Sequence, residues 1–177
     1  MWKPFERPMM SARREVLGLT GRPTAAAGHP MLYGFSRHVV DVPKAANPFG
    51  HVTGYWFADA PSSWTPPEGL ERFVAADSPV VSIGFGSMAA TDASSLTTLV
   101  RSAARAAGVR AVLLTGWGGL ETAASNDDVF VAESVPHDWL FTRVDATVHH
   151  GGAGTTGAAL RAGRPTVVVP FTVDQPF

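Results

Sequence analysis

The sequence predicts an α/β protein whose second half forms a doubly wound parallel sheet. Two observations lead to this expectation. Five short β-rich runs lie between residues 79 and 177, and helical patterns alternate with them. Strands that alternate with helices imply parallel pairing, because a parallel neighbour needs a long crossover connection. The first 77 residues lack this alternation and are instead rich in proline.

The first strand and the first helix of this half follow Pro79. Residues 80–84 read Val-Val-Ser-Ile-Gly, a short β-rich run. Asp92 is placed to cap a helix, and Gly108 is placed to end it. The apolar side chains between them recur with helical spacing, at Leu96, Leu99, Val100, Ala103, Ala104 and Ala107.

The remaining elements continue the pattern. Asp138 opens a short turn through Phe141, and a helix is expected over residues 152–162 with Gly163 at its end. Further strands are expected over residues 109–114, 129–131, 146–149 and 166–170. Ligands of doubly wound sheets bind at the carboxyl ends of the strands, so the loops that follow the strands are the expected place for a site.

The first 77 residues contain most of the prolines, so long regular elements are not expected there. A short helix is predicted over residues 11–17, stopped by Gly18, and an extended segment over residues 51–57. We interpret residues 1–77 as an interdomain linker with the remnant of an N-terminal domain. Disorder is the alternative, but Trp2, Trp56 and Trp64 indicate a surface that these residues meet.

Composition excludes several classes of protein. Charged residues make up 16% of the chain and the net charge is −1, so a nucleic-acid partner is not expected. The absence of cysteine excludes disulfides and cysteine nucleophiles, and agrees with a cytoplasmic location. Neither a signal peptide nor a long apolar run is present, so any membrane contact is expected to be peripheral.

Residues 149–156, His-His-Gly-Gly-Ala-Gly-Thr-Thr, come between a predicted strand and a predicted helix. Glycines leave the backbone open to a ligand, and free amides at a helix N-terminus attract an anion. Histidine and threonine side chains add donors. A tight turn without a ligand is the alternative, but packing alone does not need this polar set. The loop is neither a Walker motif nor a dinucleotide fingerprint.

Two other loops should reach the same edge of the sheet. Residues 84–88, Gly-Phe-Gly-Ser-Met, offer amides and a hydroxyl to a phosphate, although a simple turn has the same composition. Asp174 and Gln175 follow the last strand and supply donors and acceptors that suit sugar hydroxyls. An exposed loop pair is the alternative there.

Four segments together resemble one family, namely residues 82–88, 135–141, 149–156 and 170–175. With them the sequence is similar to the C-terminal domain of the inverting glycosyltransferase superfamily that includes sterol glucosyltransferases, UDP-glucuronosyltransferases, and bacterial macrolide and glycopeptide glycosyltransferases. The run Val-Pro-His-Asp-Trp-Leu-Phe at 135–141 is typical of the sterol-glucosyltransferase-like branch. Residues 33–57 resemble the interdomain linker of the same family.

The resemblance implies a GT-B fold, in which two Rossmann-like domains face each other across a cleft. The C-terminal domain would bind a UDP- or dTDP-sugar donor, and the N-terminal domain a lipid, sterol or natural-product acceptor. A hexose would pass to an acceptor hydroxyl with inversion. The base belongs to the N-terminal domain, so no catalytic residue is expected in this chain. Residues 78–177 are expected to be a nucleotide-sugar-binding domain that is incomplete at its C-terminus.

The resemblance also assigns roles to residues. For the diphosphate it implies His150, the backbone of Gly151, Gly152, Gly154 and Thr155, and the first-loop residues Gly86 and Ser87. For the donor sugar it implies Asp174 and Gln175. For the nucleobase it implies Ser134, Val135 and His137, and many relatives carry a stacking Trp where this chain has Ser134. Trp139 is expected to pack the turn.

The resemblance implies no metal and no other cofactor, because the helix N-terminus and side chains take the diphosphate charge. Two alternatives to a transferase fragment remain open. One is a non-catalytic module that binds a nucleotide sugar, and the other is an inactive gene fragment. The isolated chain is expected not to turn over, and the flanking genomic sequence would distinguish these possibilities.

Overall fold

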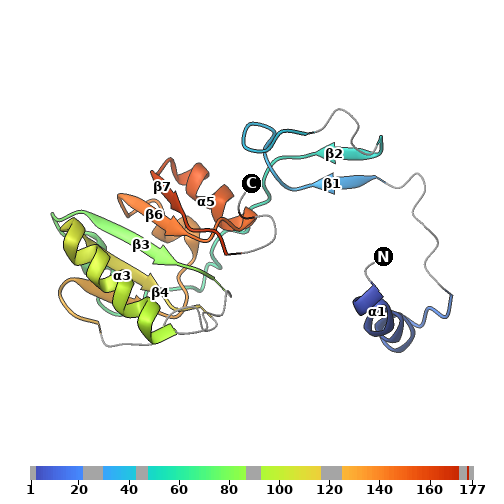
Figure 1. The fold of residues 1–177 in the computed structure, drawn as a ribbon, viewed down its shortest axis with the longest axis horizontal. Helices are drawn as coiled ribbons and strands as arrows, with labels where there is room; N and C mark the ends of the chain where they lie inside the picture. Colours follow the sequence, from blue (N-terminus) through green and yellow to red (C-terminus); the bar gives the residue numbers. More distant parts are fainter. Residues whose placement is uncertain are drawn as a thin grey trace.

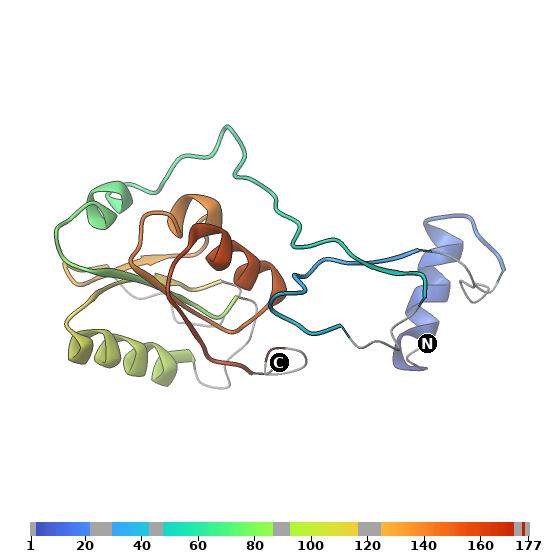
Figure 2. The same ribbon diagram turned by 90° about the horizontal axis from the view of Figure 1, so that it is seen from above.

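A computed structural model describes residues 3–21, 30–42, 48–86, 93–116, 125–171 and 175. Its main body is a five-stranded sheet with helices on both faces (Figures 1 and 2). Three N-terminal elements lie apart from this body in both views: α1 (Lys3–Glu15), β1 (Met31–Tyr33) and β2 (Gly50–Val52). The predicted α/β class is confirmed.

All strands of the main sheet are parallel, and their order is β5-β4-β3-β6-β7. The chain therefore builds outward from β3 in one direction, returns, and adds β6 on the other side. This reversal leaves a crevice at the carboxyl ends of β3 and β6. The five strands are β3 (Val80–Gly84), β4 (Arg110–Leu114), β5 (Val129–Ala132), β6 (Ala146–His149) and β7 (Thr166–Val168).

Apolar side chains cover both faces of the sheet. On one face, Val100 and Ala104 of α3 pack in a cluster with Ile83 and Leu113. On the other face, α2, α4 and α5 contribute to a second cluster. The packed body therefore reaches back to Leu70, which is fully buried. Figure 2 shows the helices on the two faces of the sheet. The helices are α2 (Leu70–Val74), α3 (Ala93–Ala107), α4 (His137–Leu140) and α5 (Ala153–Ala162).

Glycine ends both long helices of the body as predicted. Gly108 follows α3 with φ +64°, and Gly163 follows α5 with φ +66°, a left-handed conformation that glycine adopts without a Cβ penalty. The expected cap Asp92 lies outside the described residues. The helix expected to begin at residue 152 begins at Ala153, with Gly152 at the N-cap.

Two expectations were wrong in extent. The predicted helix over 11–17 is the C-terminal part of α1, which begins at Lys3 and contains Pro8. Proline removes one helical hydrogen bond but does not end this helix. The last strand ends at Val168 rather than Pro170. Its partner β6 ends at His149, which pairs with Val168, so the ladder has no further residues to continue.

The segment from Thr53 to Trp64 runs from β2 back across the sheet body. Of the extended segment predicted over residues 51–57, only residues 51 and 52 lie in a strand, and residues 53–61 carry no regular secondary structure. Trp64 packs edge-on against Trp139 with ring centroids 5.4 Å apart, so this tryptophan meets its own domain rather than a separate surface. Trp139 packs the α4 turn, as expected.

Candidate functional site

The crevice between β3 and β6 is the place where the predicted loops meet. Gly84 at the end of β3 pairs with His149 at the end of β6, so the two loops leave the sheet at the same level. Gly86 has φ +63° and Gly151 has φ +88°, and both values belong to the left-handed region that favours glycine. These turns direct the backbone of both loops around one side chain, that of His150.

The imidazole of His150 lies between two glycines. A Cβ added to Gly86 would lie 3.0 Å from Cε1 of His150, and one added to Gly152 would lie 2.5 Å from Nε2. A side chain at either position would therefore displace the ring. The absence of side chains at positions 86 and 152 is what leaves room for the imidazole at the entrance of α5.

The first turn of α5 presents backbone donors beside this imidazole. The first i→i−4 bond of the helix runs from the Thr156 N–H to the Gly152 carbonyl at 2.9 Å. The amides of Ala153, Gly154 and Thr155 precede it and have no partner within the helix. The N-cap residue, Gly152, has no side chain with which to cap them. These donors and the helix dipole make the N-terminus of α5 suited to an anion.

A small cavity of about 120 Å³ lies at the carboxyl ends of the strands. Residues of β3, β4 and β6, and of the loops that follow these strands and β5, line it. The predicted site residues among its walls are Gly86, Ser134, Val135, His137, His150 and Thr155. The sequence-based prediction therefore selected residues that the fold brings together from three separate segments.

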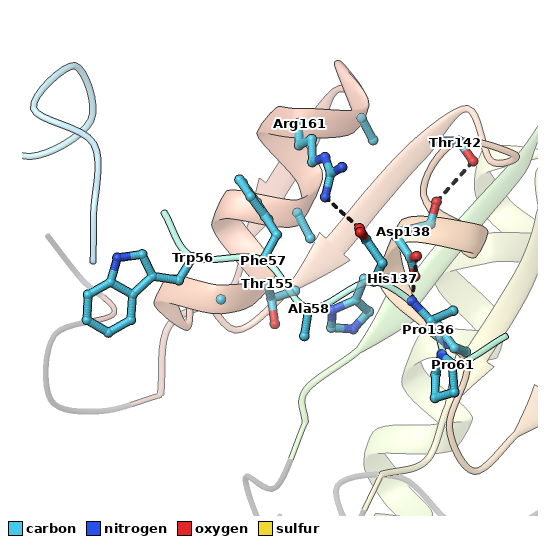
Figure 3. Close-up of a pocket in the computed structure, with 15 residues that line it drawn as sticks. Trp56, Phe57, Ala58, Pro61, Pro136, His137, Asp138, Thr142, Thr155 and Arg161 are labelled. Atoms are coloured by element: carbon cyan, nitrogen blue, oxygen red, sulfur yellow. Dashed lines mark hydrogen bonds and ion pairs between the residues drawn. The ribbon is translucent and has the colours of Figure 1, made fainter. Parts of the chain in front are cut away.

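A larger cavity of about 710 Å³ adjoins it, and His137 and Thr155 line both (Figure 3). Its walls are α4 and α5 on one side and residues 56–61 on the other. Gly154 also lines it. The two cavities therefore lie side by side at the first turn of α5.

Contacts from α4 and α5 hold residues 55–60 in place as the outer wall. The Ala60 N–H donates to Oδ2 of Asp138 at 2.8 Å, and this bond holds the pKa of Asp138 below its usual value. Arg161 pairs with Asp59 at 3.1 Å. Tyr55 packs on Gly157, where an added Cβ would lie 2.6 Å from the tyrosine ring.

Three histidines surround the small cavity. Burial lowers the pKa of His137, an effect that Asp138 partly opposes and His150 reinforces. Burial, followed by His150 and His137, lowers the pKa of His149 to about 4. His137 also stacks on Phe141, with ring centroids 4.6 Å apart. His137 and His149 are therefore neutral near pH 7.

The remaining predicted site residues lie beside the glycine-rich loop, in the core, or outside the described residues. Gly151 lies next to Gln175, since an added Cβ would be 3.2 Å from the Gln175 carbonyl oxygen. The Gln175 side chain accepts from the Phe171 N–H at 2.7 Å. Val135 is 3% exposed and packs in the core, so its backbone alone can face a ligand. Ser87 and Asp174 lie outside the described residues.

Sequence reasoning assigned no specific role to His149, which also lines the small cavity. The sequence signal that could have indicated it is the alternation of side chains along β6, which places His149 on the same buried face as Thr147. It also missed Asp59 and Asp138 as parts of the larger cavity's wall, and Tyr55 as the residue that packs on Gly157. Their roles depend on tertiary contacts that no local pattern shows.

Among the described residues, no group of three or more histidine, aspartate or glutamate side chains is placed to hold a metal ion. In the same part of the chain, no helix has the length and apolar character needed to cross a bilayer.

Residues 112–177 match a domain family described as "Erythromycin biosynthesis protein CIII-like, C-terminal domain". The sterol 3-beta-glucosyltransferase of Aspergillus clavatus is 44% identical over 160 residues, which is 84% of this chain and 11% of that protein. The sterol 3-beta-glucosyltransferase of Cryptococcus neoformans is 39% identical over 203 residues, covering 99% of this chain and 13% of its own length. The chain thus spans about an eighth of these relatives.

The crystal structure of the glycosyltransferase SnogD from Streptomyces nogalater has a similar fold. Its TM-score is 0.58 at 26% sequence identity, and the match covers 95% of this chain and 45% of that one. The match extends over the N-terminal elements as well as the sheet body. The predicted family resemblance is thereby confirmed.

Proposed function

This chain belongs to the glycosyltransferase superfamily with the GT-B fold that includes the sterol 3-beta-glucosyltransferases, and from this premise we propose that it is the donor-binding part of such an enzyme. The donor is a UDP- or dTDP-sugar. The reaction transfers a hexose to a hydroxyl of a lipid, sterol or natural-product acceptor, with inversion at the anomeric carbon.

One observation carries the proposal: the His150 ring is held between Gly86 and Gly152 at the N-terminus of α5. The imidazole and the free amides of the first turn converge where β3 and β6 end. A diphosphate is the part of a nucleotide sugar that this arrangement suits, because it is an anion with many acceptor oxygens and no donors.

The larger cavity suits the nucleoside. It lies next to the diphosphate site, with His137 and Thr155 in the walls of both, and its volume of about 710 Å³ is in the usual range for small-molecule sites. Ser134 and the Val135 backbone line the small cavity beside it. In this proposal Ser134, Val135 and His137 contact the nucleobase, and Ser87, Asp174 and Gln175 contact the phosphates and the donor sugar.

The chemistry assigned to these residues is stabilisation of the leaving group. As the bond between the anomeric carbon and the phosphate oxygen breaks, negative charge develops on the diphosphate. Donors already oriented toward it stabilise that charge without reorganisation. His150 and the α5 amides supply such donors, so we expect binding without a metal. The base that deprotonates the acceptor hydroxyl belongs to the acceptor-binding part of the enzyme.

Calorimetric titration of this chain with UDP, dTDP and uridine tests the proposal. UDP or dTDP should bind at least tenfold more tightly than uridine, because the diphosphate supplies charge-assisted hydrogen bonds. The affinity should be equal in EDTA and in excess Mg²⁺. No detectable binding of either diphosphate would overturn the proposed function, and a large gain with Mg²⁺ would overturn the metal-free site.

A further inference from the structure

His149 is a buried histidine at the end of β6, beneath the first turn of α5. It is 1% exposed and lines the small cavity. Along β6 its side chain lies on the same face as Thr147. Val148 points the other way, into the cluster that packs with α3. The His149 ring therefore lies on the α5 side of the sheet.

The two ring nitrogens of His149 have different surroundings. Nδ1 accepts a hydrogen bond from the Gly151 N–H at 3.1 Å. A neutral imidazole carries one proton, so the acceptor role of Nδ1 places that proton on Nε2. Burial keeps the ring neutral by lowering the pKa of His149 to about 4. The backbone of the glycine-rich loop thus fixes the tautomer.

The resulting Nε2–H donor is buried, and within the described part of the chain it has no hydrogen-bond partner. Buried donors in native proteins are almost always paired, since an unmade hydrogen bond is costly. After burial, the neighbouring His150 and His137 also lower the pKa of His149, so this ring donates as a neutral imidazole. The Nε2–H of His149 therefore offers an uncharged donor to an acceptor atom of a ligand.

We propose that the Nε2–H of His149 donates a hydrogen bond to a diphosphate oxygen of the bound nucleotide sugar. This contact rests on the function proposed above. The small cavity holds about 120 Å³, which admits a phosphate group. Gly84, Gly86 and Gly116 line it and leave backbone, not side chains, facing the ligand. His149 and His150 then hold the diphosphate from two sides, one buried and one at the entrance.

Two substitutions separate this role from a structural one. His149→Gln places an amide donor near the position of Nε2 but loses the acceptor for the Gly151 N–H. His149→Asn keeps an acceptor near the position of Nδ1 but loses the distant donor. UDP and uridine are titrated into both variants and the unsubstituted chain, and a thermal melt of each variant confirms that it is folded.

The proposal expects UDP binding to weaken about tenfold or more in His149→Asn and by less than about threefold in His149→Gln, while uridine binding is unchanged in both. A histidine that only supports the loop gives the reverse order for UDP. That reversal, or equal UDP affinity in all three proteins, would overturn the contact. The unsubstituted chain binding UDP in the same titration shows that the proposed function stands independently of that result.

Discussion

The two walls of the candidate site are built differently. The inner wall, formed by residues 149–152 and Gly86, is a close fit in which an imidazole fills the space that two glycines leave. The outer wall, residues 55–60, is held by an exposed ion pair and by a bond to the half-buried carboxylate of Asp138, and only Tyr55 packs closely, on Gly157. Close packing tolerates few substitutions, whereas exposed polar contacts tolerate many. The inner wall should therefore dominate ligand affinity.

The largest difference in ligand affinity between the two walls is expected from Gly152→Ala. Its backbone φ of −58° suits alanine, but the new Cβ would lie 2.5 Å from Nε2 of His150 and would move the ring. UDP affinity should fall about tenfold or more, which corresponds to about 1.4 kcal/mol. Calorimetry measures it. Gly21→Ala is the matched control, because an added Cβ there contacts nothing. Equal affinity in Gly152→Ala and the control would contradict the close fit.

The inner wall also predicts a dependence of stability, rather than of affinity, on pH. The pKa of His149 is about 4 in the folded protein and about 6.5 in the unfolded chain. Protons therefore bind preferentially to the unfolded chain between these values. The contribution of neutral His149 to the free energy of unfolding is fully present above pH 6.5 and is lost as the pH falls toward 4. The loss from this residue is about 3 kcal/mol.

Urea unfolding at pH 7.0, 6.0, 5.0 and 4.5 measures this slope. Carboxylates also titrate in this range, so the comparison is with His149→Asn, which keeps an acceptor for Gly151 and cannot titrate. The free energy of unfolding of the unsubstituted chain should fall more steeply than that of the variant. Parallel curves would show that His149 is not a buried neutral imidazole.

The smallest effect is expected from the outer wall. Asp59→Ala removes the ion pair with Arg161, whose side chains are 74% and 50% exposed. Exposed ion pairs contribute roughly 0.2–1 kcal/mol, so UDP affinity should change by less than about fivefold. The same titration measures it, and Glu68→Ala, which removes another exposed carboxylate, is the control. A loss as large as that of Gly152→Ala would mean that the two walls act as one unit.

The same contrast explains what the sequence could predict. The strands over 80–84 and 146–149 have the predicted bounds because β-rich composition and the following glycines are local signals. The glycine-rich loop also predicted an anion site without any tertiary information. The extent of α1 could not be predicted, because Pro8 indicated a break that the helix does not make.

The fit of His150 between Gly86 and Gly152 could not be predicted either. Gly86 lies 64 positions before His150 in the sequence, and Gly152 lies 2 positions after it. Only the pairing of β3 with β6 brings Gly86 to the ring. Tyr55 on Gly157 is a second example, since the outer wall comes from a segment about a hundred residues before α5. Local patterns indicated which residues carry the chemistry, and tertiary contacts decided how they are held.

Titration of UDP into His150→Ala tests the central claim most directly. We expect the dissociation constant to rise at least tenfold, since the loss of one strong hydrogen bond to a charged group corresponds to about 1.5–3 kcal/mol. His51→Ala, which removes an exposed histidine of β2, should bind as the unsubstituted chain does. Equal affinity of His150→Ala and His51→Ala would contradict the account, because the imidazole between the two glycines would then not contact the diphosphate.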